Sequence, residues 1–195
     1  MKYKILFFVI LVIVSVAFAG YYIGNSSTNQ ENTIFRTILY AQSKASDVSI
    51  IDQKAEAFYL EASYFYEDRD YNDVESNCRL ARDYYMDSSQ KYKEIKSEIL
   101  SYGIKDNLIN IYTGSLEILS EISLNMYEAC EHFESASRYY DTYYNTNVPA
   151  NDMSYDMGTG EIDAMNEKIK LHDENVKKYN SLLSDFEVEL KKRIE

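Results

Sequence analysis

The strongest constraint on the fold is a regular alternation of four- and three-residue spacings between Leu108 and Tyr143. It continues without interruption over ten intervals, which is typical of a long α-helix packed against its neighbours at a shallow angle. We therefore predict a helix over residues 105–145. The face that it buries consists of Leu108, Tyr112, Ser115, Leu119, Ile122, Met126, Ala129, Phe133, Ala136, Tyr140 and Tyr143.

Two more stretches repeat this spacing and predict helices over residues 72–101 and 161–194. Gly103 follows the first of them and is expected to end it in a left-handed conformation. The buried face of the first is Val74, Cys78, Ala81, Tyr85, Ser88, Tyr92, Ile95 and Ile99. That of the second is Ile162, Met165, Ile169, His172, Val176, Tyr179, Leu183, Phe186 and Leu190.

A further helix is predicted over residues 31–69, but its apolar pattern is interrupted. The pattern begins with Ile34, Ile38, Ala41, Ala45 and Val48, slips by one residue, and continues with Ile51, Ala55, Phe58, Ala62 and Phe65. Such a slip predicts a bend or a local change of winding. A break at residues 45–47, with Asp47 as the cap, is the alternative.

Few residues in the chain would interrupt helices, since it contains one Pro and six Gly. Polar residues 68–73 suit a tight turn, and residues 146–160 are predicted to form the one obvious loop. The fold class is therefore all-α, an elongated antiparallel bundle of about four long helices. The apolar stripes are narrow, so part of the packing could involve a second copy of the chain.

An apolar stretch, residues 5–23, precedes the bundle and contains no charged residue. A helix of this length spans roughly 28 Å, close to the hydrocarbon thickness of a bilayer. Lys2 and Lys4 come before it, which predicts a cytoplasmic N-terminus and an extracytoplasmic domain. Residues 1–23 are thus expected to be a signal-anchor transmembrane helix of a single-pass protein, followed by a linker (24–30) and the bundle domain (31–195).

A cleaved signal peptide is the alternative reading of the same stretch. Ala17 and Ala19 flank Phe18 just before Gly20, which is the small-x-small pattern of a cleavage site. Cleavage between Ala19 and Gly20 would give a secreted protein. Retention is favoured because the apolar run continues to Ile23.

The charge balance narrows the range of partners. The chain has 32 Asp and Glu against 20 Lys and Arg, and a net charge of −12. Such a chain repels phosphate backbones, so no nucleic-acid partner is expected. The two cysteines, Cys78 and Cys130, could form a disulfide outside the cell, or remain as buried thiols.

Residues 62–81 carry a resemblance to a known repeat. Ala62 falls on a small position, Phe65 on an aromatic one, and Ala81 on a later alanine. Asp70 and Tyr71 fall on the turn. Residues 55–88 thus resemble one degenerate tetratricopeptide helical hairpin, with Val74 and Cys78 departing from its pattern. The resemblance implies a helical hairpin and binding of a peptide or protein, and it covers a single repeat.

The sequence contains no recognisable catalytic arrangement. His132 and His172 lack the Glu-x-x-His spacing of di-iron bundles, and there is no glycine-rich phosphate loop. We therefore expect no enzyme, no metal and no cofactor.

Tyr139 and Tyr144 lie off the buried face and are a possible interaction patch. The leading hypothesis is a membrane-anchored, extracytoplasmic helical bundle that acts through protein–protein contact or self-association. The alternative is a ligand-sensing or solute-binding ectodomain that works with a partner membrane protein.

Overall fold

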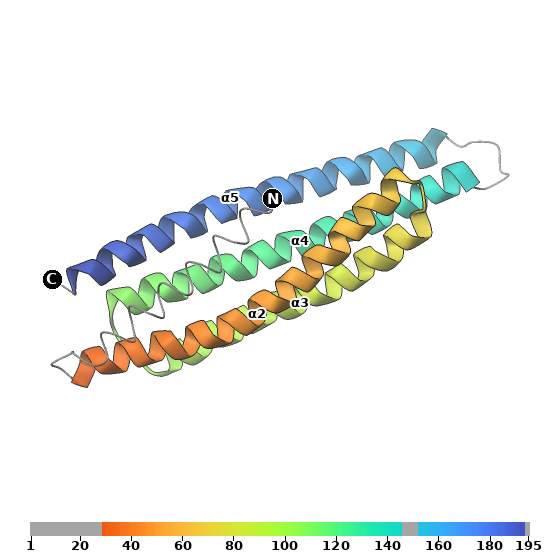
Figure 1. The fold of residues 1–195 in the computed structure, drawn as a ribbon. Coiled ribbons are helices and arrows are strands. Elements are labelled where there is room, and N and C mark those ends of the chain that lie inside the picture. The colour runs from red at the N-terminus through yellow and green to blue at the C-terminus, as the bar shows by residue number, and fades with distance from the viewer. Residues whose placement is uncertain (1–28, 146–151, 194–195) are drawn as a thin grey trace.

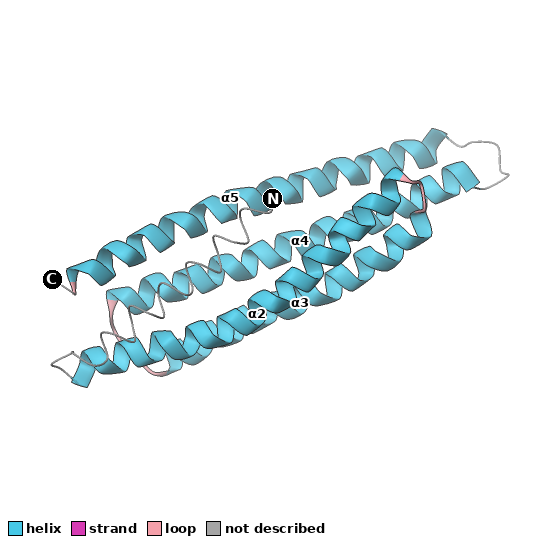
Figure 2. Ribbon diagram, in the orientation of Figure 1, coloured by secondary structure: helices cyan, strands magenta, loops and turns pink. Residues whose placement is uncertain are grey.

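The computed structural model describes residues 29–145 and 152–193 and shows four long helices. They are α2 (Asn29–Glu67), α3 (Tyr71–Ser101), α4 (Asn107–Asn145) and α5 (Asp152–Lys192). They run up and down in alternation to form an elongated bundle (Figure 1), and the described part contains no strand (Figure 2). The all-α antiparallel bundle is confirmed.

The two described turns are tight, as their sequences predict. Asp70 caps the N-terminus of α3, where its carboxylate accepts a hydrogen bond from the Asp73 backbone N–H at 3.4 Å. Arg69 takes a left-handed conformation with φ of 62° to close this turn. Gly103 does the same after α3, with φ of 66°, as expected for a glycine that ends a helix.

The predicted faces of α3 and α4 form most of the core. All eight residues on the α3 face are buried, and only Ile122 and Tyr143 on the α4 face are half-buried. α3 lies between α2 and α4, and α4 lies between α3 and α5. The faces predicted to be buried on these two helices are therefore confirmed.

The core is divided at mid-height by a layer of small polar side chains. Between this layer and the end of the bundle that carries Tyr102 lies a cluster rich in Ile and Leu. Between the layer and the opposite end, which carries Arg69, lies a cluster of Ala, Cys and aromatic residues. Within the layer, Ser89 and Ser120 share a hydrogen bond of 2.9 Å between their hydroxyl oxygens. Ser120 also donates to the Ser89 backbone carbonyl at 3.0 Å, which ties α3 to α4. Hydrogen bonding of this kind offsets the cost of burying hydroxyl groups.

The carboxylate of Glu134 is buried between α3 and α4, in the half of the bundle that carries Arg69. Its Oε2 accepts a hydrogen bond from Arg82 at 2.6 Å, and its Oε1 pairs with Arg138. Arg82 also lies over the ring of Tyr127 and donates to its hydroxyl at 3.1 Å. The negative charge is therefore compensated by cations from both helices, as burial of a charge requires.

α5 begins earlier than the sequence predicts. The loop expected over residues 146–160 is wrong for residues 152–160, which are helical and include Gly158 and Gly160. Gly158 serves a packing role, because a Cβ at this position would lie 2.9 Å from the Tyr140 ring. The glycine thus allows α5 to approach α4 closely, and the other residues of the predicted loop lie outside the described part.

α2 is a single continuous helix, so the alternative break at residues 45–47 is wrong. Ala41, Val48, Ala55 and Ala62 are buried along it. Beyond Val48, side chains on both sides of this line are half-buried, including those of Ile51 and Asp52. The apparent slip therefore marks the place where a polar residue enters the buried face.

None of the described helices is long and apolar enough to cross a membrane. The apolar stretch predicted to do so, residues 5–23, lies outside the described residues together with the linker.

Candidate functional site

An elongated cavity of about 720 Å³ lies between α2 and α5, with α4 as its floor. Its lining extends from Gln42 to Leu60 on α2 and from Ile169 to Phe186 on α5. At 1.5 Å per residue, these segments make the groove roughly 26 Å long. Ligand pockets usually enclose roughly 300–1,000 Å³, so the groove has the volume of a small-molecule site and an unusually elongated form.

The groove exists because α5 packs on α4 alone. No Cα atom of α5 lies within 8 Å of a Cα atom of α2 or α3. Of the nine residues on its predicted buried face, Phe186 alone is buried and the other eight are half-buried. A four-helix bundle that closed fully would cover this face with α2.

The chemistry of the walls explains why α2 does not cover α5. The α2 wall is mostly polar, whereas the floor and the α5 wall are mostly apolar. The polar wall consists of Gln42, Ser46, Ser49, Asp52, Gln53 and Glu56. The apolar surfaces include Ile111, Leu116, Leu119, Ile122, Met126, Ile169, Val176, Leu182, Leu183 and Phe186. Contact between these walls would bury polar groups of α2 against apolar side chains that offer them no hydrogen bond, which opposes closure.

Asp52 is the most distinctive residue of the groove. Its Oδ2 accepts a hydrogen bond from the Tyr92 hydroxyl at 2.9 Å, and its Oδ1 accepts one from the Ser123 hydroxyl at 3.0 Å. The carboxylate of α2 is therefore held by donors from α3 and α4. It lies at the level of the polar layer that separates the two apolar clusters.

The surroundings of Asp52 disfavour its charge. Burial raises its pKa to about 6, the hydroxyl groups of Ser88, Tyr92 and Ser123 oppose the increase, and the negative charge of Glu56 adds to it. Desolvation is the dominant cause, as for carboxyl groups in apolar sites generally.

Charges in the groove are almost all negative. Asp52, Glu56 and Asp173 line it, His172 is the one lining side chain that can become cationic, and no Lys or Arg is among the lining residues. Nδ1 of His172 lies 3.2 Å from a carboxylate oxygen of Asp173. The other histidine, His132, is outside the groove and pairs with Glu161 at 2.6 Å between α4 and α5.

The sequence analysis did not identify Asp52, although a signal for it was present. The four–three alternation of α2 continues without a slip if Asp52 is included. The series is Ile34, Ile38, Ala41, Ala45, Val48, Asp52, Ala55, Tyr59, Ala62 and Tyr66. A half-buried carboxylate on an otherwise apolar and aromatic seam, with a raised pKa, is the kind of titratable group that marks functional sites.

The predicted interaction patch, Tyr139 and Tyr144, lies at the C-terminal end of α4, away from the groove. Tyr139 is half-buried, whereas Tyr144 is 44% exposed. Tyr144 stacks on Tyr71 at 6.1 Å between ring centroids, and the side chain of Arg69 lies 5.0 Å from its ring centre.

Cys78 and Cys130 are free thiols, buried in the same cluster of Ala, Cys and aromatic residues. Burial raises the pKa of Cys78 well above its usual value and that of Cys130 to about 12, which disfavours the thiolate form of both. A disulfide between them stays a prediction.

Within the described residues, no group of three or more His, Cys, Asp or Glu side chains is arranged to hold a metal ion.

Comparison with models of known protein families, with characterised proteins and with solved structures gives no significant match.

Proposed function

We propose that this protein is a non-enzymatic binding protein, and that the groove between α2 and α5 holds an elongated, mainly apolar guest. The observation that supports this most is the cavity of about 720 Å³, lined by half-buried apolar side chains of α5 and the apolar floor of α4. A guest that filled the cavity would remove this apolar surface from water, which favours binding by roughly 25 cal/mol for each Å² covered.

The proposed setting is the outer face of a membrane. The apolar residues 5–23 anchor the chain as a single-pass helix, and residues 31–195 lie outside the cytoplasm. Cleavage after Ala19 would instead release the same bundle. In either setting, the groove has access to amphiphilic molecules from the bilayer or its surroundings.

A photoreactive long-chain alcohol, with a diazirine in its alkyl chain, tests the binding function. The full-length chain is reconstituted in lipid nanodiscs and labelled, and the modified residues are mapped by mass spectrometry. We expect labelling on the groove segments of α4 and α5. Labelling confined to residues 5–23, or to the outer helix faces, would contradict the proposal.

A pair of tryptophan variants provides a matched control for this experiment. Ser49 lines the groove, so Ser49→Trp places an indole in the cavity and is expected to reduce labelling there. Ser43 is exposed on the same helix and does not line the groove, so Ser43→Trp should leave labelling unchanged. Equal labelling of both variants would show that the probe does not occupy the cavity.

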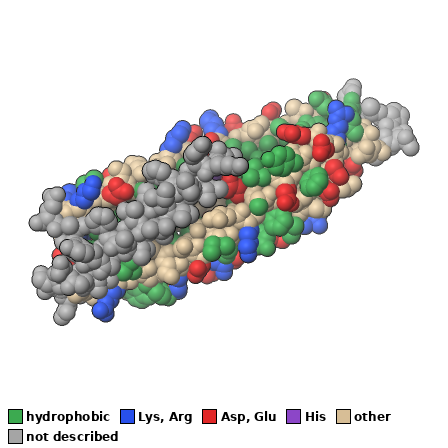
Figure 3. Space-filling view, viewed as in Figure 1, with side chains coloured by type: hydrophobic (Ala, Val, Ile, Leu, Met, Phe, Trp, Pro, Cys, Tyr) green, Lys and Arg blue, Asp and Glu red, His purple; other side chains and the backbone are tan. Residues whose placement is uncertain are grey.

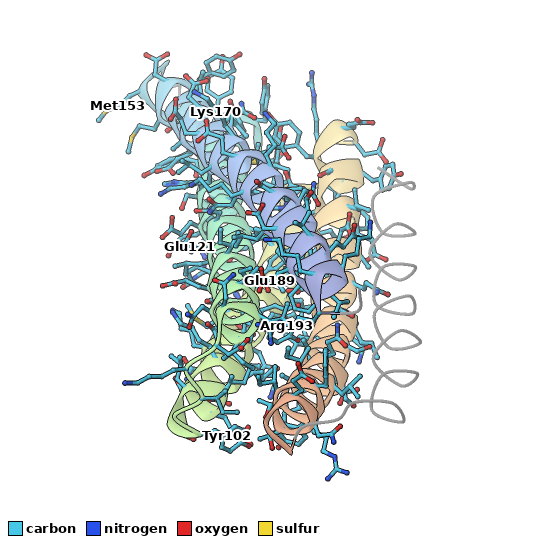
Figure 4. All side chains as sticks on the ribbon, turned by 90° about the vertical axis from the view of Figure 1, so that its left-hand side faces the viewer. Tyr102, Glu121, Met153, Lys170, Glu189 and Arg193 are labelled. Atoms are coloured by element: carbon cyan, nitrogen blue, oxygen red, sulfur yellow. The ribbon has the colours of Figure 1, made fainter. Side chains whose placement is uncertain are left out.

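A second function, contact with a protein partner, is supported by the end of the bundle opposite Tyr102. Large apolar side chains are exposed there, and Figure 4 shows Met153 projecting from it. Hydrophobic and acidic side chains lie next to one another toward this end in Figure 3. The exposed residues include Tyr64, Tyr144, Met153, Tyr155 and Met157. Exposed Tyr and Met side chains are common anchors of protein interfaces.

Site-specific crosslinking tests this second function. A photoreactive amino acid replaces Tyr144 in one variant and Tyr102, which is 49% exposed at the opposite end, in the other. We expect crosslinks to a membrane neighbour or a second copy from position 144 and not from position 102. Equal crosslinking from both positions would contradict a specific surface at this end.

A further inference from the structure

Asp52 faces the apolar floor and α5 wall of the groove, and its hydrogen-bond partners supply no positive charge. The hydrogen bonds from Tyr92 and Ser123 use two of the roughly four acceptor positions of a carboxylate. Both donors are neutral hydroxyl groups. The half-buried carboxylate, when ionised, therefore lacks the cation that usually compensates such a charge.

The rest of the lining also selects for the sign of a guest's charge. Glu56 and Asp173 add negative charges, and no lining residue is Lys or Arg. A guest with a carboxylate or phosphate group would therefore meet like charge along the groove. A guest with a positive charge would gain attraction from Asp52, strengthened by the low dielectric of the cavity.

The position of Asp52 along the groove is equally informative. The lining on α2 extends for about ten residues before Asp52 and for eight residues after it, so the carboxylate lies near the middle. Apolar side chains of α4 and α5 line both halves, among them Leu116 and Met126. A matching guest thus has a cationic group with apolar parts on one or both sides.

We infer that the groove recognises a protonated amine on an elongated apolar body, and that Asp52 is the residue that pairs with the amine. The inference rests on the proposed binding function and adds the chemical class of the ligand. Tyr92 and Ser123 hold the Asp52 carboxylate in place, and the apolar floor and α5 wall receive the hydrocarbon.

Three photoreactive probes with the same diazirine alkyl chain test the inference. They carry an amine, an alcohol or a carboxylate at one end, and they are applied to the full-length chain in nanodiscs of zwitterionic lipid. In the wild-type chain, we expect the amine to label the groove segments of α4 and α5 several-fold more than the alcohol, and the carboxylate to label them least.

Variants separate recognition by Asp52 from general attraction to an acidic protein. Asp52→Asn should lower amine labelling to the level of the alcohol and leave alcohol labelling unchanged. Asp87→Asn removes an exposed carboxylate of α3 outside the groove and should keep the preference for the amine. Comparison between variants also cancels differences in how the probes enter the bilayer.

The outcomes distinguish the two proposals. Equal groove labelling by amine and alcohol, unaffected by Asp52→Asn, would overturn the amine inference and leave apolar binding intact. The absence of groove labelling by all three probes would overturn both. A preference for the amine that persists in Asp52→Asn would show that Asp52 is not the residue that recognises it.

Discussion

Replacement of Asp52 by Asn should stabilise the folded protein at neutral pH. Burial raises the pKa of this carboxyl from 3.8 to about 6. Two pKa units at about 1.4 kcal/mol each mean that ionised Asp52 costs the fold about 3 kcal/mol relative to its protonated form. Asn keeps the size and one acceptor oxygen of Asp52, and it carries no charge.

The pH dependence follows from the direction of the shift. Because the pKa is higher in the folded state, that state binds the Asp52 proton more tightly than the unfolded chain does. The wild-type chain should therefore lose stability as the pH increases from 3.8 to about 6, and level off above that range. The stability of Asp52→Asn should not show this decrease. The difference in free energy of unfolding between variant and wild type should therefore grow by about 3 kcal/mol, in favour of the variant, between pH 3.5 and pH 7.5.

Urea denaturation at a series of pH values measures this difference. The full-length wild-type and variant chains are placed in small vesicles of zwitterionic lipid, and unfolding is followed by far-UV circular dichroism. Asp87→Asn, at an exposed carboxylate, is the control and should follow the wild-type curve. A free-energy difference between wild type and Asp52→Asn that stays constant from pH 3.5 to 7.5 would refute the reasoning.

Two further pairs of variants test the packing of α5, with stability measured by the same denaturation assay. Gly158→Ala should lower the free energy of unfolding, because its Cβ would meet the buried ring of Tyr140 at 2.9 Å. Gly160→Ala has open space and should raise it by roughly 0.5–1 kcal/mol; a similar effect at both glycines would contradict the close approach. Leu116→Ala, in the floor and 1% exposed, should cost roughly 2–5 kcal/mol. Leu183→Ala, on the half-buried α5 wall, should cost clearly less, and equal losses would mean that α5 is fully packed.

The sequence predicted the helices better than it predicted how they enclose space. The α3 and α4 faces were identified because each is apolar or small at every step of a regular alternation, and a central helix must satisfy two neighbours. The start of α5 was missed because Gly158 was interpreted as a loop residue. Its role depends on Tyr140, which is distant in sequence and close in the fold.

The groove could not be predicted from the residue pattern of any single helix. The apolar face of α5 has the same spacing as the α3 face, and nothing in that spacing tells whether a second helix covers it. The polar wall of α2 carries that information, but only after α2 and α5 are known to be opposite one another. Asp52 was overlooked for a related reason, since a search for apolar periodicity passes over the one carboxylate on the seam.

The open α2–α5 side is the central feature of this account, and a disulfide scan across it is the most direct test. Cysteines are placed in pairs at Ser49 or Gln53 on α2 and at Val176 or Asn180 on α5, in a chain whose native cysteines are changed to alanine. Ser89 and Ser120, whose hydroxyl oxygens lie 2.9 Å apart, provide the positive control pair.

A direct disulfide requires Cα atoms within about 7 Å, whereas all Cα pairs between α2 and α5 are more than 8 Å apart. We expect the control pair to oxidise readily and the α2–α5 pairs to remain reduced under the same mild oxidant. Rapid and complete oxidation of an α2–α5 pair would show that the two helices close on each other in solution, and it would contradict the groove.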